Sequence, residues 1–231
     1  MTKRKIQYWV IPPEANAEFV ASMEEVLKTY AQPYDERYPV VCMDEQPVQL
    51  LKETRVPVPA GKAHPRRMDY EYERAGTASI FMFCGPLSGW RETRVRERRT
   101  KVDGAQEVEE LLRTRYAGAE KVILVCDNLN THTKGAFYEA FEPEKARSIV
   151  RRLEFRYTLK HGSWLNIAEN ELSSLTRQCL KGRRLGDIEL FRAETTCWHE
   201  ASNAKQRGVD WQFKIDDARR KLKSLYPKIL I

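Results

Sequence analysis

A chain of 231 residues is long enough to bury a substantial hydrophobic core, and its apolar fraction of 42% is ordinary for a globular protein. Forty Lys and Arg against 33 Asp and Glu leave a net charge of +7, which fits an anionic partner such as nucleic acid and fits a merely soluble basic surface about equally well. No run approaches the roughly 20 apolar residues of a membrane span, and no apolar segment follows the basic N-terminus as in a signal peptide. Five scattered cysteines without a CxxC pair predict reduced thiols, not a disulfide framework or a zinc ribbon, which fits the cytosol.

The N-terminal part of the chain is predicted to supply one helix and the first strands of a sheet. Apolar residues recur at helical spacing over 14–30, before Pro33. Short apolar runs over 38–44 and 48–51 predict a buried strand and a separate partner strand. The stretch 56–67 is rich in proline and predicts an exposed loop.

The middle of the chain alternates strands with a helix. An apolar strand over 78–84 is followed by a strongly basic strand over 90–101. Asp103 is predicted to cap a helix that Gly118 ends. The run 121–127 is the clearest buried strand of the sequence.

The remainder of the chain is mostly helical. Two helical patches are predicted over 133–141 and 144–151, then a strand over 153–157 and a helix over about 163–179. Further helices follow beyond Gly182. Strands interleaved with helices in this way predict an α/β layer fold.

Two of the predicted strands end in the same way. An apolar run precedes Asp44, and another precedes Asp127, so each Asp stands at the carboxyl end of a strand, where open α/β sheets bind ligands. Two nearby carboxylates repel each other, and a hard divalent cation is the simplest way to stabilise them. Either Asp alone is more simply a turn or cap residue. For the two aspartates together, a metal site and a pair of turn or cap residues are about equally good interpretations.

The helix over 163–179 offers a third carboxylate. Glu169 falls near the edge of its apolar face, whereas Glu171 points further away. A residue at the edge of a packed face can reach the end of a neighbouring sheet. Glu169 is therefore predicted to join the two aspartates, with Glu171 in solvent or in a supporting position.

Three short segments carry a family resemblance. They are 42–47 (CMDEQP), 125–132 (VCDNLNTH) and 161–169 (HGSWLNIAE). In this order they resemble the three signatures of DDE transposases, and the branch they resemble most is the bacterial insertion-sequence relatives of mariner transposases. The last two segments together are specific. The resemblance extends over about residues 9–226.

The resemblance implies an RNase H-like α/β fold, with a mixed central sheet of about five strands flanked by helices. On that basis we expect an N-terminal helical lead-in over 1–35, a catalytic core over 36–182 and a C-terminal helical extension over 183–231 packed on the core. Relatives usually carry an N-terminal helix-turn-helix region. Because 35 residues are too few to hold one, we expect a truncated chain or one half of a split reading frame.

The same resemblance implies a catalytic and metal-binding triad of Asp44, Asp127 and Glu169. Two Mg²⁺ ions, for which Mn²⁺ can substitute, would be held by these side chains and would drive phosphoryl transfer on DNA. Water would nick the element's end, and the freed 3′-hydroxyl would then join that end to target DNA. The implied enzyme is a transposase, an endonuclease and strand transferase of insertion-sequence transposition.

Polar residues near the triad are candidates for supporting it. Asn128 and its neighbour Asn130 fit a turn after the strand, and Asn166 fits a helix N-cap. His132 and His161 lie beside the second and third carboxylates. Each of these histidines either touches a scissile phosphate or caps a neighbouring helix, and we favour the structural role.

Basic residues on the strand over 90–101 and just after the helix over 163–179 are candidate phosphate contacts. They are Arg94, Arg96, Arg98, Arg99, Lys181, Arg183 and Arg184. Contacts of this kind give salt-dependent affinity without sequence preference. The alternative is a solvated strand edge that discourages sheet aggregation.

The partner implied by the family is double-stranded DNA, both the element's ends and a target containing TA, bound by a homodimer in the synaptic complex. The expected location is the bacterial cytoplasm, associated with the nucleoid. No glycine-rich loop of P-loop form occurs, so no nucleotide cofactor is expected. Two alternatives remain: a domesticated DNA-binding protein that does not cleave, and another RNase H-like nuclease such as a hybrid ribonuclease or junction resolvase.

Overall fold

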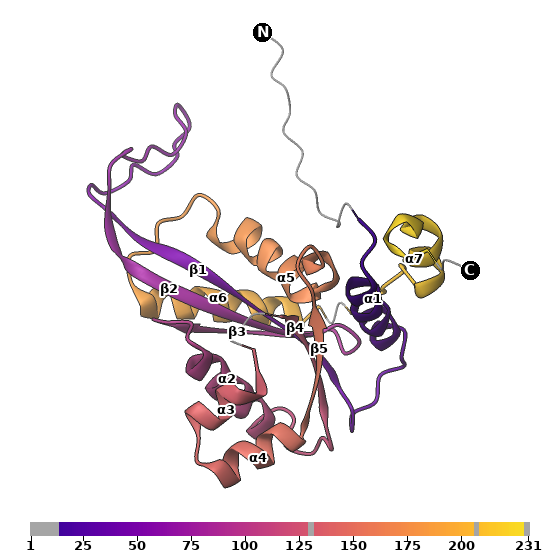
Figure 1. Cartoon of the computed structure of the whole chain (residues 1–231). Coiled ribbons are helices and arrows are strands. Elements are labelled where there is room, and N and C mark those ends of the chain that lie inside the picture. The colour runs from indigo at the N-terminus through magenta and orange to yellow at the C-terminus, as the bar shows by residue number, and fades with distance from the viewer. Residues whose placement is uncertain (1–13, 129–131, 206–207, 229–231) are drawn as a thin grey trace.

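A five-stranded mixed sheet forms the centre of the computed structural model, which describes residues 14–128, 132–205 and 208–228 (Figure 1). The strands are β1 (Val40–Glu53), β2 (Tyr72–Gly85), β3 (Trp90–Arg96), β4 (Val122–Asp127) and β5 (Leu153–Thr158). Their order across the sheet is β3-β2-β1-β4-β5. β1, β2 and β3 pair antiparallel, whereas β1, β4 and β5 pair parallel. Residues 1–13 of the predicted lead-in and Asn130 lie outside the described residues.

Helices cover both faces of the sheet (Figure 1). One face packs against α1 (Ala17–Tyr30), α5 (Ile167–Leu175), α6 (Ile188–Asn203) and α7 (Ile215–Lys221). The other packs against α2 (Lys101–Arg113), α3 (Lys134–Ala140) and α4 (Pro143–Arg151). None of the described helices combines the length and the apolar character that a membrane crossing requires. The observed α/β architecture is the one that the alternation of strands and helices predicted.

Strand β1 lies between the two core layers and alternates strictly between them. Val40 and Cys42 are buried with α1 and α5, whereas Val41 and Met43 are buried with α2. Successive side chains of a strand point to opposite faces, so the residues that follow inherit the same alternation. This period is what sends the next two carboxyl side chains of β1 to different sides of the sheet.

Helix α1 forms as its apolar spacing predicts, but it starts later. Asn16 is its N-cap, with the side-chain oxygen accepting a hydrogen bond from the Phe19 backbone N–H at 2.9 Å, so the helix does not open at Glu14. Phe19, Met23 and Leu27 are buried on the inward face. The cap satisfies one of the otherwise unpaired N–H groups of the first turn.

The predicted strands over 38–44 and 48–51 are one continuous strand, so their separation was wrong. Pro47 lies inside β1, opposite Ser79 of β2. The pairing of β1 with β4 ends at Cys42, so the later part of β1 is an edge on that side, where a residue without an N–H is tolerated. Between β1 and β2, the predicted loop over 56–67 folds back on itself as a projecting arm, closed by a bridge between Val58 and Arg67 (Figure 1).

The start of α2 also differs from expectation. Thr100 is the N-cap, and its hydroxyl accepts from the Asp103 backbone N–H at 3.2 Å. Asp103 returns the interaction by accepting from the Thr100 N–H at 2.8 Å. This reciprocal arrangement is a capping box, in which the acidic residue is the third residue of the helix and not its cap. β3 therefore ends at Arg96, earlier than the basic run suggested.

Replacing Phe191 by Ala should test how far the fold depends on α6. Phe191 is fully buried against the sheet, whereas its neighbour Leu190 is 47% exposed. We expect Phe191→Ala to lower the free energy of unfolding by about 3–5 kcal/mol, because it leaves a cavity, and Leu190→Ala to change it by less than about 0.5 kcal/mol. Urea denaturation followed by circular dichroism measures both. Equal effects would contradict the described packing of α6.

Candidate active site

Asp44 and Asp127 end the buried parts of two neighbouring parallel strands. β1 and β4 pair in register from Val40 with Ile123 to Cys42 with Val125, and the same offset sets Asp44 beside Asp127. Cys42 and Val125 are buried on the face that carries α5. By the period of two, both aspartates belong to that face.

Asn166 attaches the start of α5 to β1. Its side-chain oxygen accepts from the Ala168 backbone N–H at 3.2 Å, which makes it the N-cap of the helix. Its amide nitrogen donates to the carbonyl oxygen of Met43 at 2.9 Å, and the residue is 1% exposed. Because Met43 directly precedes Asp44, this contact brings the first turn of α5, with Glu169, to the place where the two aspartates meet.

A cavity of about 620 Å³ opens at this place. Its lining includes Asp44, Gln46, Asp127, Asn166, Glu169 and Arg177. All three predicted carboxylates therefore line one cavity, although they come from three remote segments of the chain. The carboxylates and the amides in this lining offer oxygen atoms, the ligands that hard divalent cations prefer.

The surroundings of Asp44 destabilise the ionised form of its carboxyl group. Burial raises its pKa to about 6, and the charges of Asp127 and Glu169 add to the rise, against a hydrogen bond from the Glu45 backbone N–H. Desolvation and like charge both disfavour the ionised form, and a cation would reverse both. The donor set thus fits a divalent ion by its chemistry. In this conformation no three acidic, His or Cys side chains of the described residues converge tightly enough to enclose one.

His132 stands between Asp127 and a carboxylate that the sequence analysis did not single out, Glu45. Nε2 of His132 lies 3.0 Å from Glu45 Oε1, and Nδ1 lies 2.5 Å from Asp127 Oδ1. The second contact is close but lacks hydrogen-bond alignment, since Asp127 Oδ1 is buried without a hydrogen-bond partner among the described residues. Burial alone would lower the pKa of His132, but the interactions with Asp127, Cys126 and Glu45 outweigh it and raise the pKa to about 12.

Asn128 and His161, two other residues predicted to support the triad, have exposed side chains. The Asn128 backbone N–H donates to the carbonyl of Thr158 at 3.1 Å and so extends the β4–β5 pairing, while its side chain is exposed. His161 occupies an exposed turn with a φ of 67°, and it is not among the residues lining the cavity. Of the two histidines, only His132 contacts a predicted catalytic carboxylate within the described part of the chain.

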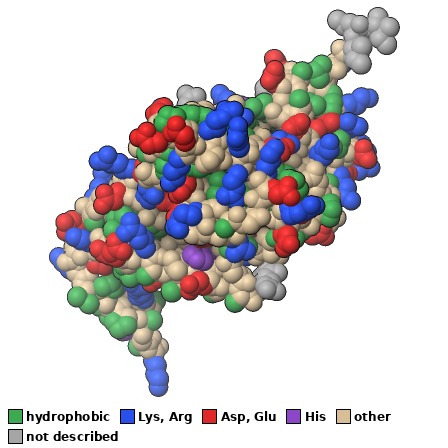
Figure 2. All heavy atoms as spheres, turned by 90° about the horizontal axis from the view of Figure 1, so that it is seen from below, with side chains coloured by type: hydrophobic (Ala, Val, Ile, Leu, Met, Phe, Trp, Pro, Cys, Tyr) green, Lys and Arg blue, Asp and Glu red, His purple; other side chains and the backbone are tan. Residues whose placement is uncertain are grey.

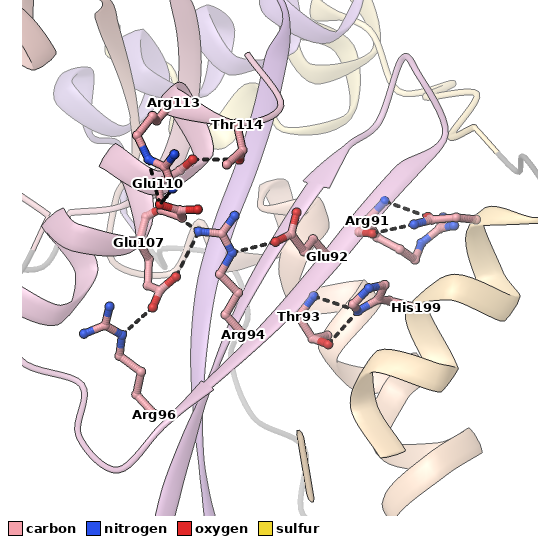
Figure 3. A network of polar contacts seen from close by, with 11 residues as sticks. Arg91, Glu92, Thr93, Arg94, Arg96, Glu107, Glu110, Arg113, Thr114 and His199 are labelled. Carbon is pink, nitrogen blue, oxygen red and sulfur yellow. Dashed lines mark hydrogen bonds and ion pairs between the residues drawn. The ribbon is translucent and has the colours of Figure 1, made fainter. Parts of the chain in front are cut away.

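The arginines of β3 lie on both faces of the sheet, with Arg94 and Arg96 on the face of α2 and Arg91 on the other. Figure 3 shows Arg94 and Arg96 reaching Glu107. Arg94 pairs with Glu92 at 2.6 Å and with Glu107 of α2 at 3.0 Å. Arg96 pairs with the same Glu107 and, at 3.2 Å, with Asp103. Both guanidinium groups are partly buried and are engaged in holding α2 against the sheet.

Arg91 serves the opposite face. Its Nε donates to Glu171 Oε2 at 2.9 Å, and the two side chains are 7% and 16% exposed. Glu171, assigned from sequence to solvent or a supporting position, thus tethers α5 to β3. The helical spacing of apolar residues predicted that Glu171 lies away from the core face, but it could not predict the buried ion pair with Arg91.

The remaining predicted phosphate contacts divide by exposure. Arg98, Arg99, Lys181 and Arg183 are exposed, but Arg183 pairs with Glu194 at 2.5 Å. Arg184 is partly buried against Glu53 at 2.6 Å. On the face seen in Figure 2, basic side chains alternate with acidic ones.

Three further residues of the site went unnoticed in the sequence. Gln46 donates to the Thr176 hydroxyl at 3.3 Å, and this ties β1 to a π-helical turn over Thr176–Leu180. Arg177, on the same turn, is an exposed cation at the cavity. Gln46 could have been predicted, because side chains alternate along β1 and Gln46 therefore lies on the same face as Asp44. The π turn carries no sequence signal that we recognise.

Comparison with known proteins gives a consistent result. The family model described as DDE superfamily endonuclease matches residues 39–192. A search of curated proteins found no match. Among solved structures, the chain is similar to the Mos1 mariner paired end complex with Mn, at 18% identity and a TM-score of 0.57 over 97% of this chain and 67% of that one.

Two other Mos1 structures give the same fold. The strand transfer complex is 17% identical with a TM-score of 0.58, over 96% of this chain and 65% of that one. The catalytic domain of Mos1 mariner transposase is 14% identical with a TM-score of 0.57, over 95% of this chain and all of that one. The chain thus spans about two thirds of the longer transposase chains.

At these identities the likeness establishes the fold, which is the RNase H-like one predicted from the sequence: a mixed five-stranded sheet flanked by helices. The family model spans well over half of the chain and contains all three carboxylates that line the cavity. The chain belongs to the DDE superfamily endonuclease family.

Proposed function

We propose that this chain is the catalytic domain of a DNA transposase, which cleaves a DNA strand and joins the freed end to a target with Asp44, Asp127 and Glu169 as its catalytic and metal-binding residues. One observation carries the proposal. In a chain of the DDE endonuclease family, carboxylates from β1, β4 and α5 line a single cavity. An acidic cavity repels DNA phosphates, so binding alone gives no reason for it, whereas metal-assisted phosphoryl transfer does.

Divalent metal, Mg²⁺ with Mn²⁺ as a substitute, is the cofactor that this donor set fits. Two such ions, when bound, would activate the attacking oxygen and stabilise the leaving one. The pKa of Asp44, raised by burial to about 6, supports this cofactor because a neighbouring cation would restore the ionised form. The paired end complexes of Mos1 were determined with Mn and with Mg.

The protein's own part in the reaction is to hold the three carboxylates in place. β1 and β4 carry the aspartates on one rigid parallel pair, and Asn166 fixes the first turn of α5 against Met43. Rigid elements hold reacting groups more accurately than loops do. In the proposed sequence, water first cleaves the phosphodiester at the element's end, and the released 3′-hydroxyl then displaces a bridging oxygen of target DNA at TA.

Double-stranded DNA is the proposed partner, and a homodimer would pair the two ends of an insertion sequence in the bacterial nucleoid. The similar Mos1 structures include a paired end complex and a strand transfer complex. Arg98 and Arg99 between β3 and α2 and Lys181 after the π turn are exposed candidates for phosphate contact, whereas the exposed Arg183 is already paired with Glu194. Arg94 and Arg96 are less suited, because breaking their pairs with Glu107 would leave that buried carboxylate uncompensated.

Asp127→Ala tests the proposed chemistry. Loss of one carboxylate should reduce metal-dependent nicking of supercoiled plasmid by about 100-fold or more, since metal assistance contributes several kcal/mol to the barrier. Glu189→Ala, which removes a carboxylate 71% exposed on α6, is the matched control and should nick like the parent. Circular dichroism should show both variants folded. Nicking by Asp127→Ala at the parent rate would reject the assignment.

A substrate panel separates this function from its alternatives. The parent should nick duplex DNA bearing element ends in preference to an RNA–DNA hybrid or a four-way junction. Preference for the hybrid or the junction would instead identify another RNase H-like nuclease. Salt-sensitive DNA binding with no cleavage in Mg²⁺ or Mn²⁺ would identify a protein that only binds.

The exposed arginines can be tested by their salt dependence. The double change Arg98→Ala and Arg99→Ala should weaken duplex binding and reduce the slope of log affinity against log salt by about 0.9 for each phosphate that the protein no longer neutralises. Arg147 and Arg151, exposed on α4, provide a charge-matched control pair. Fluorescence anisotropy over a range of salt concentrations measures both slopes. If the control pair changes the slope as much, the effect is one of net charge and not of direct binding by Arg98 and Arg99.

A further inference from the structure

Glu45 follows Asp44 directly but serves the opposite side of the sheet. The alternation of β1 sends its side chain toward α2, where its Oε1 atom lies near Gly104. The side chain is 5% exposed. A carboxylate buried to this degree needs a charged or hydrogen-bonding partner, because desolvation of an unpaired charge is costly.

That partner is His132, and the contact is well defined. The imidazole is 4% exposed, with Nε2 at 3.0 Å from Glu45 Oε1. The backbone of His132 is held as well, since its carbonyl accepts from the Tyr157 hydroxyl at 2.9 Å. Glu45 therefore limits rotation of a ring whose backbone is already anchored to β5.

The other ring nitrogen reaches the candidate metal ligand. Nδ1 of His132 lies 2.5 Å from Asp127 Oδ1 and 3.3 Å from the Asp127 carbonyl oxygen. Loss of Glu45 would remove the polar partner of Nε2, and the Asp127 carboxylate would then face a ring held less firmly. Because the side chains of Glu45 and Asp127 belong to opposite faces of the sheet, the influence of one on the other passes through the ring.

We propose that Glu45 is a positioning residue for Asp127: it acts through His132 to orient the carboxylate that faces the cavity. The inference rests on the proposed function, in which Asp127 is a metal ligand. Residues that contact a metal's ligands from outside its own shell commonly orient those ligands, and their loss weakens metal affinity by about 10–100-fold. His132 makes such a contact with Asp127 Oδ1. Asp44 and Glu45 both belong to the lining of the cavity, but the carboxylate of Glu45 contacts His132 on the α2 side.

The experiment measures Mn²⁺ binding to the full chain by electron paramagnetic resonance, with no reaction required. Glu45→Gln should bind Mn²⁺ about 10–100-fold more weakly than the parent. His132→Ala should show a similar loss, and the double variant should bind no more weakly than His132→Ala alone, since both changes interrupt one path. Glu107→Gln is the matched control: this carboxylate is also buried and ion-paired, but with Arg94 and Arg96. It should lower stability and leave Mn²⁺ affinity unchanged.

The outcomes separate this inference from the proposed function. Loss of Mn²⁺ binding in Asp127→Ala together with parent-like binding in Glu45→Gln would overturn the role of Glu45 alone. Fully additive losses in the double variant would overturn the path through His132. Equal Mn²⁺ binding by the parent and Asp127→Ala would overturn the metal site itself and the inference with it. If Glu45→Gln fails to fold, Glu45→Asp replaces it, because this change keeps the charge but moves the carboxylate away from Nε2 of His132. We expect the same loss of Mn²⁺ affinity in this variant. Parent-like Mn²⁺ binding by Glu45→Asp would contradict the proposed role of Glu45.

Discussion

Parallel pairing between β1 and β4 is the constraint on which the candidate active site depends. The register from Val40 with Ile123 to Cys42 with Val125 brings Asp44 and Asp127 to one edge and one face. Slipping this register by one residue would turn the side chains of a whole strand to the other layer. The hydrophobic core prevents such a slip, since Val41 and Cys42 are each fully buried in a different layer. Packing of the core thereby sets the geometry of the acidic cavity.

The arginines within β3 stabilise the fold and do not form an open binding surface. Arg91 holds α5 through Glu171, while Arg94 and Arg96 hold α2 through Glu107. These pairs lie on the two faces of β3, an outer strand that needs support on both sides. Figure 3 shows the pairs of Arg94 and Arg96 with Glu107. A net charge of +7 therefore says little about where DNA would bind. Exposure separates the arginines better than their position in a basic run does.

The fold was largely predictable because its signals are periodic and local. The buried strands β4 and β5 and the helices α1, α3 and α4 lie close to where apolar spacing put them. The predictions failed where two local signals conflicted. Pro47 suggested a break in β1, but an unpaired strand edge accommodates it. Asp103 suggested a helix cap, but Thr100 takes that position and Asp103 completes the capping box.

What the sequence determined by itself is the strand end of each aspartate and the helix face of Glu169, because apolar runs mark buried strands and a period of 3.6 in helices follows from backbone geometry. It also carried the three signatures that indicated the family. Tertiary structure alone decided which side chains meet: Glu45 with His132, His132 with Asp127, and Arg91 with Glu171. Most of these partners come from segments far apart in the chain. Their contacts depend on how the layers pack, and no local pattern encodes that.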